Sequence, residues 1–311
     1  MDKTREIKSR IKSISGTRKI TKAMEMIASS RIRKAQKRIL EARPFISKIE
    51  DFITDIVCYS PVSHPLLSSR TEVKNILVMG ITADRGLCGG YNSNMIRRIK
   101  RTLENIEKEG KKYKLDIIGT RGKNHFRYMG YKMNSVYENL SDHPKFLDAR
   151  KIAGRVIKSY ITGEVDEVII CYTRFNNPAE QIPSSFKLLP MTFKGKLEER
   201  RSSGDGIGMV RLGDQVCRIM PEFTYEPSME NILEGLLPEY IYTIVYTALL
   251  ESTASEIGAR MTAMKSASDN AKEIIKDLSR KYHRERQQNI TIEISEIVSG
   301  AEALTEAGKT L

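Results

Sequence analysis

The last third of this 311-residue chain carries one long helical seam, and this seam limits the folds open to the rest. From about Pro238 to Leu304, apolar or small residues recur at alternating steps of three and four, which defines a heptad seam. They are Ala254, Ile257, Met261, Met264, Ser268, Ala271, Ile275, Leu278 and Tyr282, and after a slip near 287–289 they resume at Ile290, Ile294, Ile297, Ala301 and Leu304. Such a helix is roughly 100 Å long. One apolar stripe needs a partner helix to cover it.

Residues 3–58 predict that partner. An early seam begins at Ile7, and we expect it to falter at 15–17 and to continue on a shifted face at Ile20, Met24 and Ile27. A regular run follows at Ala28, Ile32, Ala35, Ile39, Ala42, Ile46, Ile49, Ile53 and Ile56. Pro44 lies inside this run and should bend the helix locally. The simplest packing is an antiparallel coiled coil with a globular part inserted between its helices.

The middle of the chain has the pattern of an α/β domain. After a linker at 60–69, Asn75–Ile81 is a short continuous apolar run, which is typical of a strand buried on both faces. Further strands are expected at 113–119, 168–172 and 185–190, and helices at 92–109, 121–129 and 146–162. This alternation predicts an open, largely parallel sheet covered by helices.

The chain therefore divides into three expected domains. An N-terminal coiled-coil helix occupies 1–58, a globular α/β domain 70–227, and the C-terminal long helix 228–311, with a separate short helix at 228–236 before the long one begins. Inside the globular domain, residues 195–220 form a polar, glycine-rich insert. Within it, Val210–Leu212 and Gln215–Cys217 flank Gly213-Asp214, which predicts a two-residue hairpin.

Charge and composition limit the functional classes. The net charge is +13, and residues 1–43 hold fourteen Lys and Arg against four acids. Such a basic helix indicates nucleic acid, an anionic membrane surface or an acidic protein partner. No apolar run reaches the ~20 residues of a membrane span, and the N-terminus lacks the apolar stretch of a signal peptide, so a cytoplasmic location is expected. The four cysteines and four histidines are scattered, so we expect no metal site and no cofactor.

One glycine cluster, Thr82–Gly90, lies between a strand and a helix, where a phosphate-binding loop would be found. Its spacing is neither GxGxxG nor GxxxxGK[ST], so a tight turn that needs glycine is favoured over nucleotide binding. Asp84 and Arg85 could pair with each other or with a partner. No Ser/His/Asp or Cys/His arrangement can be assembled, and we expect no active site in this chain.

Several stretches resemble the gamma subunit of F-type ATP synthase, the central rotor shaft. The motifs are Ile20–Met26, Asp84–Gly90, Glu256–Lys265, Asp269-Asn270, Arg286–Thr291 and Glu296–Ala301, in the family's order along essentially the whole chain. The resemblance implies that the C-terminal end enters a ring of three alpha and three beta subunits. The globular part would bind the epsilon subunit and the c ring. Proton or sodium flow would turn the c ring and this chain together, driving ATP synthesis or hydrolysis at sites that belong to alpha and beta.

The resemblance also implies contact residues. Those expected at the beta subunits are Lys22, Met24, Asp84, Arg85, Cys88, Arg260, Arg286, Gln287 and Thr291, and those at the c-ring and epsilon end are Phe223, Tyr225 and Glu226. The chain would be peripheral, on the cytoplasmic face of a bacterial plasma membrane, which it reaches only through the c ring. Where chloroplast members carry a redox-switch cysteine pair, the insert has only Cys217, so we expect no disulfide switch but a hairpin or mobile loop that brakes rotation.

Two other readings stay open at this point. A basic coiled coil that binds nucleic acid, or acts as a scaffold, fits the charge of the first helix, although few aromatic residues interleave with the basic ones. A steep salt dependence of duplex binding would favour that alternative. A nucleotide-dependent enzyme built on the central sheet is the third possibility.

Overall fold

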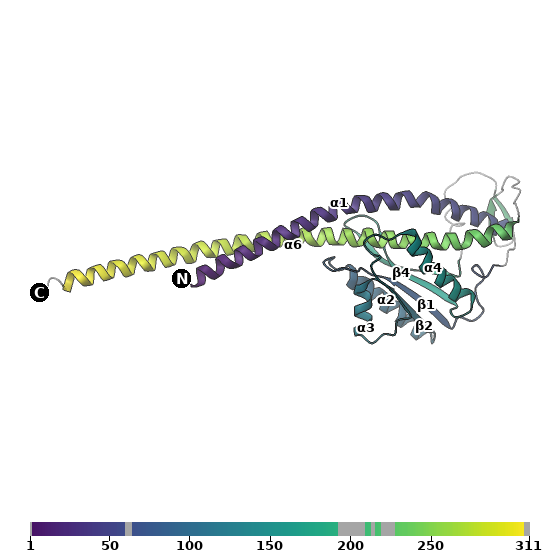
Figure 1. Ribbon diagram of the computed structural model, residues 1–311, viewed down its shortest axis with the longest axis horizontal. Helices are drawn as coiled ribbons and strands as arrows, with labels where there is room; N and C mark the ends of the chain where they lie inside the picture. The colour runs from purple at the N-terminus through teal and green to yellow at the C-terminus, as the bar shows by residue number, and fades with distance from the viewer. Residues whose placement is uncertain (1, 60–63, 192–208, 213–214, 219–227, 308–311) are drawn as a thin grey trace. The chain divides into compact units, whose positions relative to one another are not determined.

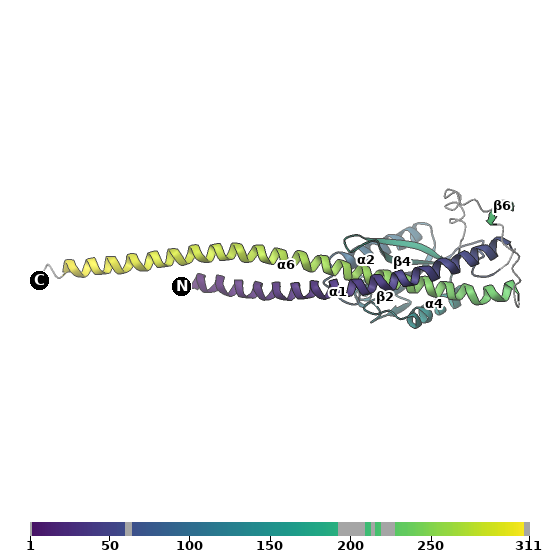
Figure 2. The ribbon, with the colours of Figure 1, turned by 90° about the horizontal axis from the view of Figure 1, so that it is seen from above.

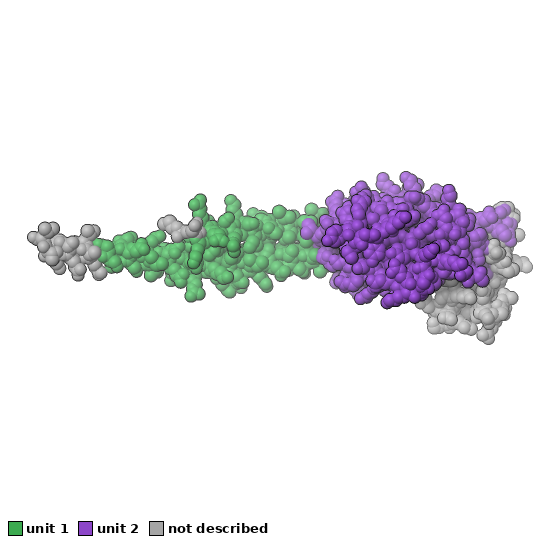
Figure 3. All heavy atoms as spheres, turned by 90° about the horizontal axis from the view of Figure 1, so that it is seen from below, with its two compact units in different colours: residues 1–28, 261–311 green, residues 29–260 purple. Residues whose placement is uncertain are grey.

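The computed structural model describes residues 2–59, 64–191, 209–212, 215–218 and 228–307. Two long helices, α1 (Asp2–Tyr59) and α6 (Met229–Ala307), lie side by side in both views (Figures 1 and 2). The chain separates into two compact units, which Figure 3 colours green and purple. The coiled-coil unit contains residues 1–28 and 261–311, and the sheet unit contains residues 29–260.

In the coiled-coil unit, the start of α1 runs antiparallel to the second half of α6 (Figure 2). The first part of the predicted α6 seam is confirmed, because Met264, Ser268 and Ala271 are buried, whereas its continuation from Ile290 is exposed. Farther along the seam, Ile275 and Tyr282 are half-buried. The heptad spacing in the sequence therefore identified the face that meets α1.

The expected shift of the α1 seam near residue 20 is wrong. Ile20 is 63% exposed and Ile27 56% exposed, whereas Thr21 is only 9% exposed. Thr21 lies one heptad from both Ile14 and Ala28, so the seam keeps its phase and accepts a polar residue. The hydroxyl of Thr21 donates to a carbonyl oxygen of its own helix, at 3.1 Å, which makes this burial tolerable.

In the sheet unit, residues 29–59 of α1 run antiparallel to residues 229–260 of α6. Near one end, a Cβ added to Gly258 would lie 3.3 Å from Ile32 Cδ1. Toward the other end, the charge of Glu50 acts on Tyr240. Both helices continue through their internal prolines, Pro44 and Pro238. The separate short helix expected at 228–236 is therefore part of α6.

The predicted open, largely parallel sheet is confirmed. Its strand order is β3-β2-β1-β4-β5, and only β5 is antiparallel to its neighbour. The strands are β1 (Asn75–Ile81), β2 (Lys112–Ile118), β3 (Ser135–Tyr137), β4 (Glu167–Phe175) and β5 (Gln181–Leu189). The helices between them are α2 (Tyr91–Lys108), α3 (Thr120–Tyr128) and α4 (Phe146–Ile161).

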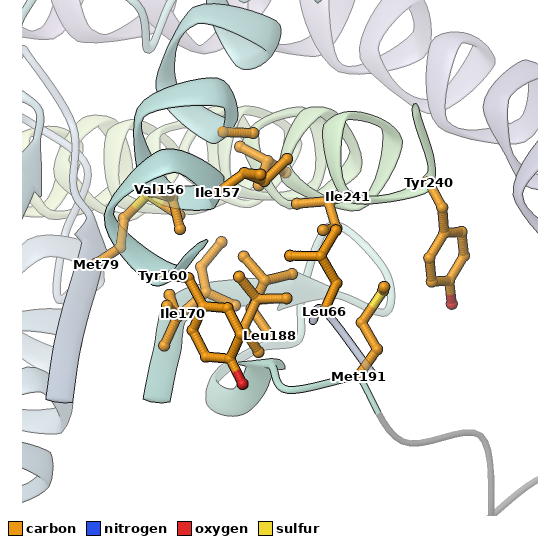
Figure 4. Packing of buried hydrophobic residues seen from close by; sticks show 14 of the residues in the cluster. Leu66, Met79, Val156, Ile157, Tyr160, Ile170, Leu188, Met191, Tyr240 and Ile241 are labelled. Carbon is orange, nitrogen blue, oxygen red and sulfur yellow. The ribbon is translucent and has the colours of Figure 1, made fainter. Parts of the chain in front are cut away.

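Side chains alternate between two cores along β1, as they must in a strand buried on both faces. Ile76 and Val78 pack against α2 and α3 in one core. Leu77 and Met79 belong to the other core, which contains α4, α6 and the end of α1. Figure 4 shows this second core, where Tyr160 and its neighbours on α4 meet residues of the sheet and of α6.

The hairpin predicted in the insert is confirmed by β6 (Met209–Leu212) and β7 (Gln215–Arg218), which pair antiparallel. Its two turn residues, and the remainder of the 195–220 insert, lie outside the described residues. Within the part of the chain that the structure describes, no helix combines the length and apolar character needed to cross a bilayer.

Candidate functional site

The loop Asp84–Gly90 joins β1 to α2, and Asp84 ties it to two other segments of the sheet unit. Asp84 Oδ1 accepts hydrogen bonds from the Thr120 N–H at 3.0 Å and the Thr120 hydroxyl at 2.9 Å. Asp84 Oδ2 accepts the Ser141 N–H, and the Asp84 N–H donates to the Ser141 hydroxyl, both at 3.0 Å. The considered pairing of Asp84 with Arg85 does not form. Asp84 is instead an anchor that points inward.

The pKa of Asp84 reflects this role. Burial acts to raise the pKa of the carboxyl, but hydrogen bonds from the backbone of Ser141, Thr120 and Asn139 outweigh it and lower the pKa below its ordinary 3.8. Hydrogen bonds to the charged form of a carboxyl favour that form. The anchor therefore stays ionised at neutral pH.

Two side chains of the loop face solvent. Leu87 is 62% exposed and has a φ of +63°, a left-handed conformation that is rare for leucine. The side chain of Arg85 is 70% exposed, and its Nη2 lies 3.1 Å from an oxygen of Asp142. Cys88 is buried, and its sulfur accepts a hydrogen bond from Asn92 at 3.1 Å. The loop thus presents Arg85 and Leu87 outward and turns Cys88 inward.

On α6, Glu256 and Arg260 lie next to this loop. Arg260 Nη2 is 2.5 Å from Glu256 Oε1, and the two side chains are 12% and 1% exposed. The same Nη2 lies 3.4 Å from the carbonyl oxygen of Gly86. The guanidinium therefore connects α6 to the loop inside the sheet unit.

Burial raises the pKa of Glu256 to about 7, although the nearby Arg260 charge acts in the opposite direction. The carboxylates of Asp142 and Asp84 raise it further. Burial, together with the charge of Glu256, also raises the pKa of the Cys88 thiol. A raised thiol pKa disfavours the thiolate, so Cys88 is an inert core residue.

Polar side chains of α6 also form hydrogen bonds to β4 and to the segment between β3 and α4. The Thr253 hydroxyl shares its single proton between the Ser141 carbonyl oxygen at 2.9 Å and the Leu249 carbonyl oxygen of its own helix at 2.8 Å. The Ser255 hydroxyl donates to the Thr173 carbonyl oxygen at 3.2 Å, and the Thr173 N–H donates to the Ser252 hydroxyl at 3.4 Å. These bonds fix α6 against β4. These hydrogen bonds can carry force between helix and sheet.

The remaining predicted contact residues on the helices belong to the coiled-coil unit. Lys22 is exposed and its Nζ lies 3.0 Å from Glu25 Oε2, whereas Met24 is half-buried. Farther along α6, three predicted contact residues are all exposed: Arg286, Gln287 and Thr291. Phe223, Tyr225 and Glu226 lie outside the described residues. Among the residues that are described, no group of three or more His, Cys, Asp or Glu side chains could hold a metal ion.

Sequence reasoning did not single out Leu87 or Glu256 as residues of this site. Leu87 lies between two predicted contact residues, and nothing in its residue type indicates a left-handed, exposed conformation. Glu256 did carry a signal, because an acid and Arg260 stand four residues apart between the seam positions Ala254 and Met261. This spacing allows the two side chains to pair on one face of the helix.

Comparison with known proteins gives matches along nearly the whole chain. The family model described as ATP synthase matches residues 3–304. The ATP synthase gamma chain of Desulforamulus reducens is 42% identical over 305 residues, covering 98% of this chain and 100% of that protein. The ATP synthase gamma chain of Frankia casuarinae is 40% identical over 304 residues, covering 96% and 97%.

Solved structures of other proteins share the fold of this chain. A chain of the central stalk and c-ring structure of Tetrahymena thermophila mitochondrial ATP synthase has a TM-score of 0.57 and 26% identity, covering 80% of this chain and 99% of that one. A chain of the Euglena gracilis mitochondrial ATP synthase has a TM-score of 0.64 over 100% of this chain and 97% of that one, at 18% identity. The second likeness bears on the fold alone.

Proposed function

Because this chain belongs to the ATP synthase gamma-chain family, we propose that it is a rotor shaft. It transmits rotation between a c ring in the membrane and a catalytic ring of alpha and beta subunits, and so couples proton or sodium translocation to ATP synthesis or hydrolysis. It contributes no active site of its own. The family match supports this role over a nucleic-acid-binding coiled coil.

The observation that carries the proposal is an apolar stripe without a partner in the coiled-coil unit. Residues 290–300 of α6 are all exposed. Among them Ile290, Ile294 and Ile297 are 44%, 57% and 71% exposed, and their spacing puts them on one face of the helix. Contiguous exposed apolar residues mark an interaction surface. We infer that the inner wall of the alpha and beta ring covers this stripe.

Most of the other proposed contacts with beta are polar or charged. They involve Lys22, Met24, Asp84, Arg85, Cys88, Arg260, Arg286, Gln287 and Thr291. Because Cys88 and Asp84 point inward, they act by shaping the loop, and Leu87 joins Arg85 as its outward contact. Exposed ion pairs contribute only ~0–1 kcal/mol each, so such contacts can break at every step of a rotation.

The opposite end of the chain would bind the c ring and the epsilon subunit through Phe223, Tyr225 and Glu226. In this proposal residues 1–58 and 228–311 form the shaft, and residues 70–227 form the part that is held near the membrane. The chain is then peripheral, on the cytoplasmic face of a bacterial plasma membrane. The 195–220 insert acts as a brake, which predicts faster ATP hydrolysis by the complex when the insert is deleted.

Co-purification from gently solubilised membranes tests the proposal. An affinity-tagged full chain is expected to bring down two kinds of larger nucleotide-binding subunit, each in threefold excess over the tagged chain. Recovery of the tagged chain as a lone soluble protein would overturn the rotor assignment.

A matched pair of variants tests the stripe. Ile294→Ser combined with Ile297→Ser removes two isoleucines, each contributing about 1.5–3 kcal/mol when fully buried, so binding to the ring should weaken roughly 100-fold or more. Ile274→Ser is the control, because Ile274 is 48% exposed but lies about 200° around α6 from Ile294. Equal retention of both variants under a dilution challenge would show that the ring does not cover the stripe.

A further inference from the structure

A groove lies between α2 and the antiparallel edge of the sheet, away from the loop at Asp84. Its volume is about 330 Å³, and it is lined by residues of α2, β4 and β5 and by the segment that leads into β2. Its apolar lining comes from Ile76, Ile106, Ile169 and Phe186. A cavity of this size is at the lower end of the range for small-molecule sites, about 300–1,000 Å³, so it selects a small ligand.

The charges that line this groove do not balance. Four basic residues line it, namely Arg98, Arg101, Lys111 and Lys187, against the two acids Glu109 and Glu167. Each acid is already paired with a lysine. Lys187 Nζ lies 2.9 Å from Glu167 Oε2, and Lys111 pairs with Glu109. Two arginines are therefore left without a carboxylate among the described residues.

Arg98 has a buried donor with no acceptor. One of its terminal nitrogens, Nη2, donates to the Ser185 hydroxyl at 2.7 Å. Its Nε is buried and has no hydrogen-bond partner in the described structure. A guanidinium whose Nε finds no acceptor keeps donor capacity to spare. Its terminal nitrogens belong to a residue that lines the groove, so they can serve an acceptor oxygen there.

The local sequence explains why these groups converge. Arg98, Arg101, Thr102 and Asn105 are spaced so that they follow one side of α2. The neighbouring side of α2 is committed to the core through residues such as Ile99. Ser185 and Lys187 extend from the same face of β5, because they are two residues apart in a strand. The groove thus has hydrogen-bond donors on both sides and a net positive charge.

We propose that this groove binds a small oxyanion of the phosphate class. Arg98 and Arg101 are its main ligands, because a guanidinium matches the geometry of phosphate oxygens and these two have no competing carboxylate. The amide of Asn105 and the hydroxyl of Ser185 are further groups within the groove. Free inorganic phosphate and the phosphates of a nucleotide share this chemistry. The site does not depend on the rotor role proposed above.

Titration of the purified full chain with sodium phosphate tests the proposal, with sodium chloride at equal ionic strength as the comparison. Binding is followed by calorimetry and by the rise in melting temperature, since a ligand that binds only the folded state stabilises it. Arg98→Gln and Arg101→Gln should each weaken phosphate binding tenfold or more. Arg97→Gln is the matched control, because Arg97 is exposed on α2 and does not line the groove.

The outcomes separate clearly. Heat and stabilisation with phosphate but not chloride, lost in the Arg98 and Arg101 variants and kept in the Arg97 variant, would support the site. Binding of ADP through the same two arginines would support it with nucleotide phosphate as the source. No phosphate-specific effect on the unaltered chain, or equal loss in all three variants, would overturn it. Arg101 is exposed, so its variant keeps the test valid even if Arg98→Gln fails to fold.

Discussion

Replacing Glu256 with glutamine should stabilise the chain at alkaline pH. The side chain of Glu256 is 1% exposed, and its partner Arg260 is 12% exposed. Burial raises the pKa of Glu256 to about 7 from its ordinary 4.5, even with this cation beside it. The folded state therefore disfavours the carboxylate, and a neutral group of the same shape avoids that penalty.

The size of the effect follows from the two pKa values. A difference of about 2.5 pH units corresponds to about 3 kcal/mol, at 1.36 kcal/mol per unit. Between pH 4.5 and 7 the folded state binds the proton that the unfolded state has released. The contribution of Glu256 to stability is thus fully present below about pH 4.5 and is lost as the pH rises to about 7.

Glu256→Gln imitates the protonated form at every pH. The variant and the parent should be about equally stable near pH 4.5, and the variant should be more stable by about 3 kcal/mol at pH 8. For a unit of this size, 1 kcal/mol shifts the melting temperature by roughly 2–4 °C, so a rise of about 6–12 °C is expected at pH 8.

Thermal melts of the two proteins across pH 5–8 measure this difference. Comparing the variant with the parent at each pH cancels the titrating groups that do not interact with Glu256. Glu239→Gln is the control, because Glu239 lies on the same helix with its side chain 44% exposed. A difference between Glu256→Gln and the parent that stays constant with pH would refute the reasoning. Lower stability of the variant at pH 8 would show that the ion pair with Arg260 outweighs its burial.

Three further substitutions and one control, Gly110→Ala, test how the sheet unit is held together, each read from the urea midpoint of the purified chain. Gly119→Ala should lower the free energy of unfolding by about 3 kcal/mol or more, because φ is +102° and the new Cβ would lie 2.2 Å from the Thr82 carbonyl oxygen. Gly110 has a φ of +70° but open space around it, so Gly110→Ala should lower the free energy of unfolding by only about 1 kcal/mol. Asp84→Asn should cost about 2 kcal/mol through weakened charge-assisted hydrogen bonds, and a loss below 0.5 kcal/mol, roughly within error, would contradict the anchor role. Thr253→Val should cost about 1–2 kcal/mol, since it leaves a buried carbonyl oxygen without its donor.

The long helices could be predicted because a heptad repeat encodes the face that meets a partner. The repeat was a poor guide at Thr21, at Pro238 and beyond residue 289, where the predicted seam positions are exposed. Thr21 stays in the seam because a hydroxyl can bond to its own helix. Pro238 stays inside α6 because burial of Leu237 and Ile241 on either side outweighs one missing backbone donor.

The edges of the sheet were harder to predict than its centre. β3 is only three residues long and has no apolar run, and tertiary contacts hold it. The Asn134 side chain donates to Asp116 at 2.8 Å, and its backbone N–H donates to Leu115 at 2.7 Å, just before β3 begins. β5 begins at Gln181, four residues before the expected start. Its first residues pair with β4, but they show no apolar pattern from which a strand could be predicted.

Sequence reasoning placed the glycine-rich loop at 84–90 between a strand and a helix, but not the direction of its side chains. The family resemblance named Asp84, Arg85 and Cys88 alike as contacts, yet among the side chains of this loop Arg85 and Leu87 are the exposed ones. The orientation depends on Thr120 and on residues more than fifty positions away, which hold Asp84 by hydrogen bonds. Long-range bonds of this kind leave no local pattern in a single sequence.

Directional polar contacts oppose rotation of α6 about its own axis against the sheet. The hydroxyls of Thr253 and Ser255 donate to the carbonyl oxygens of Ser141 and Thr173, and Glu251 accepts a backbone N–H of β4 at 3.3 Å. Apolar packing has no preferred direction, so a helix can turn in an apolar groove by exchanging one side chain for another. A buried hydrogen bond is lost outright when the helix turns, at about 1–3 kcal/mol for each group left unsatisfied. Because these residues lie within two turns of α6, rotation would break their bonds together, so the segment resists torque as a block.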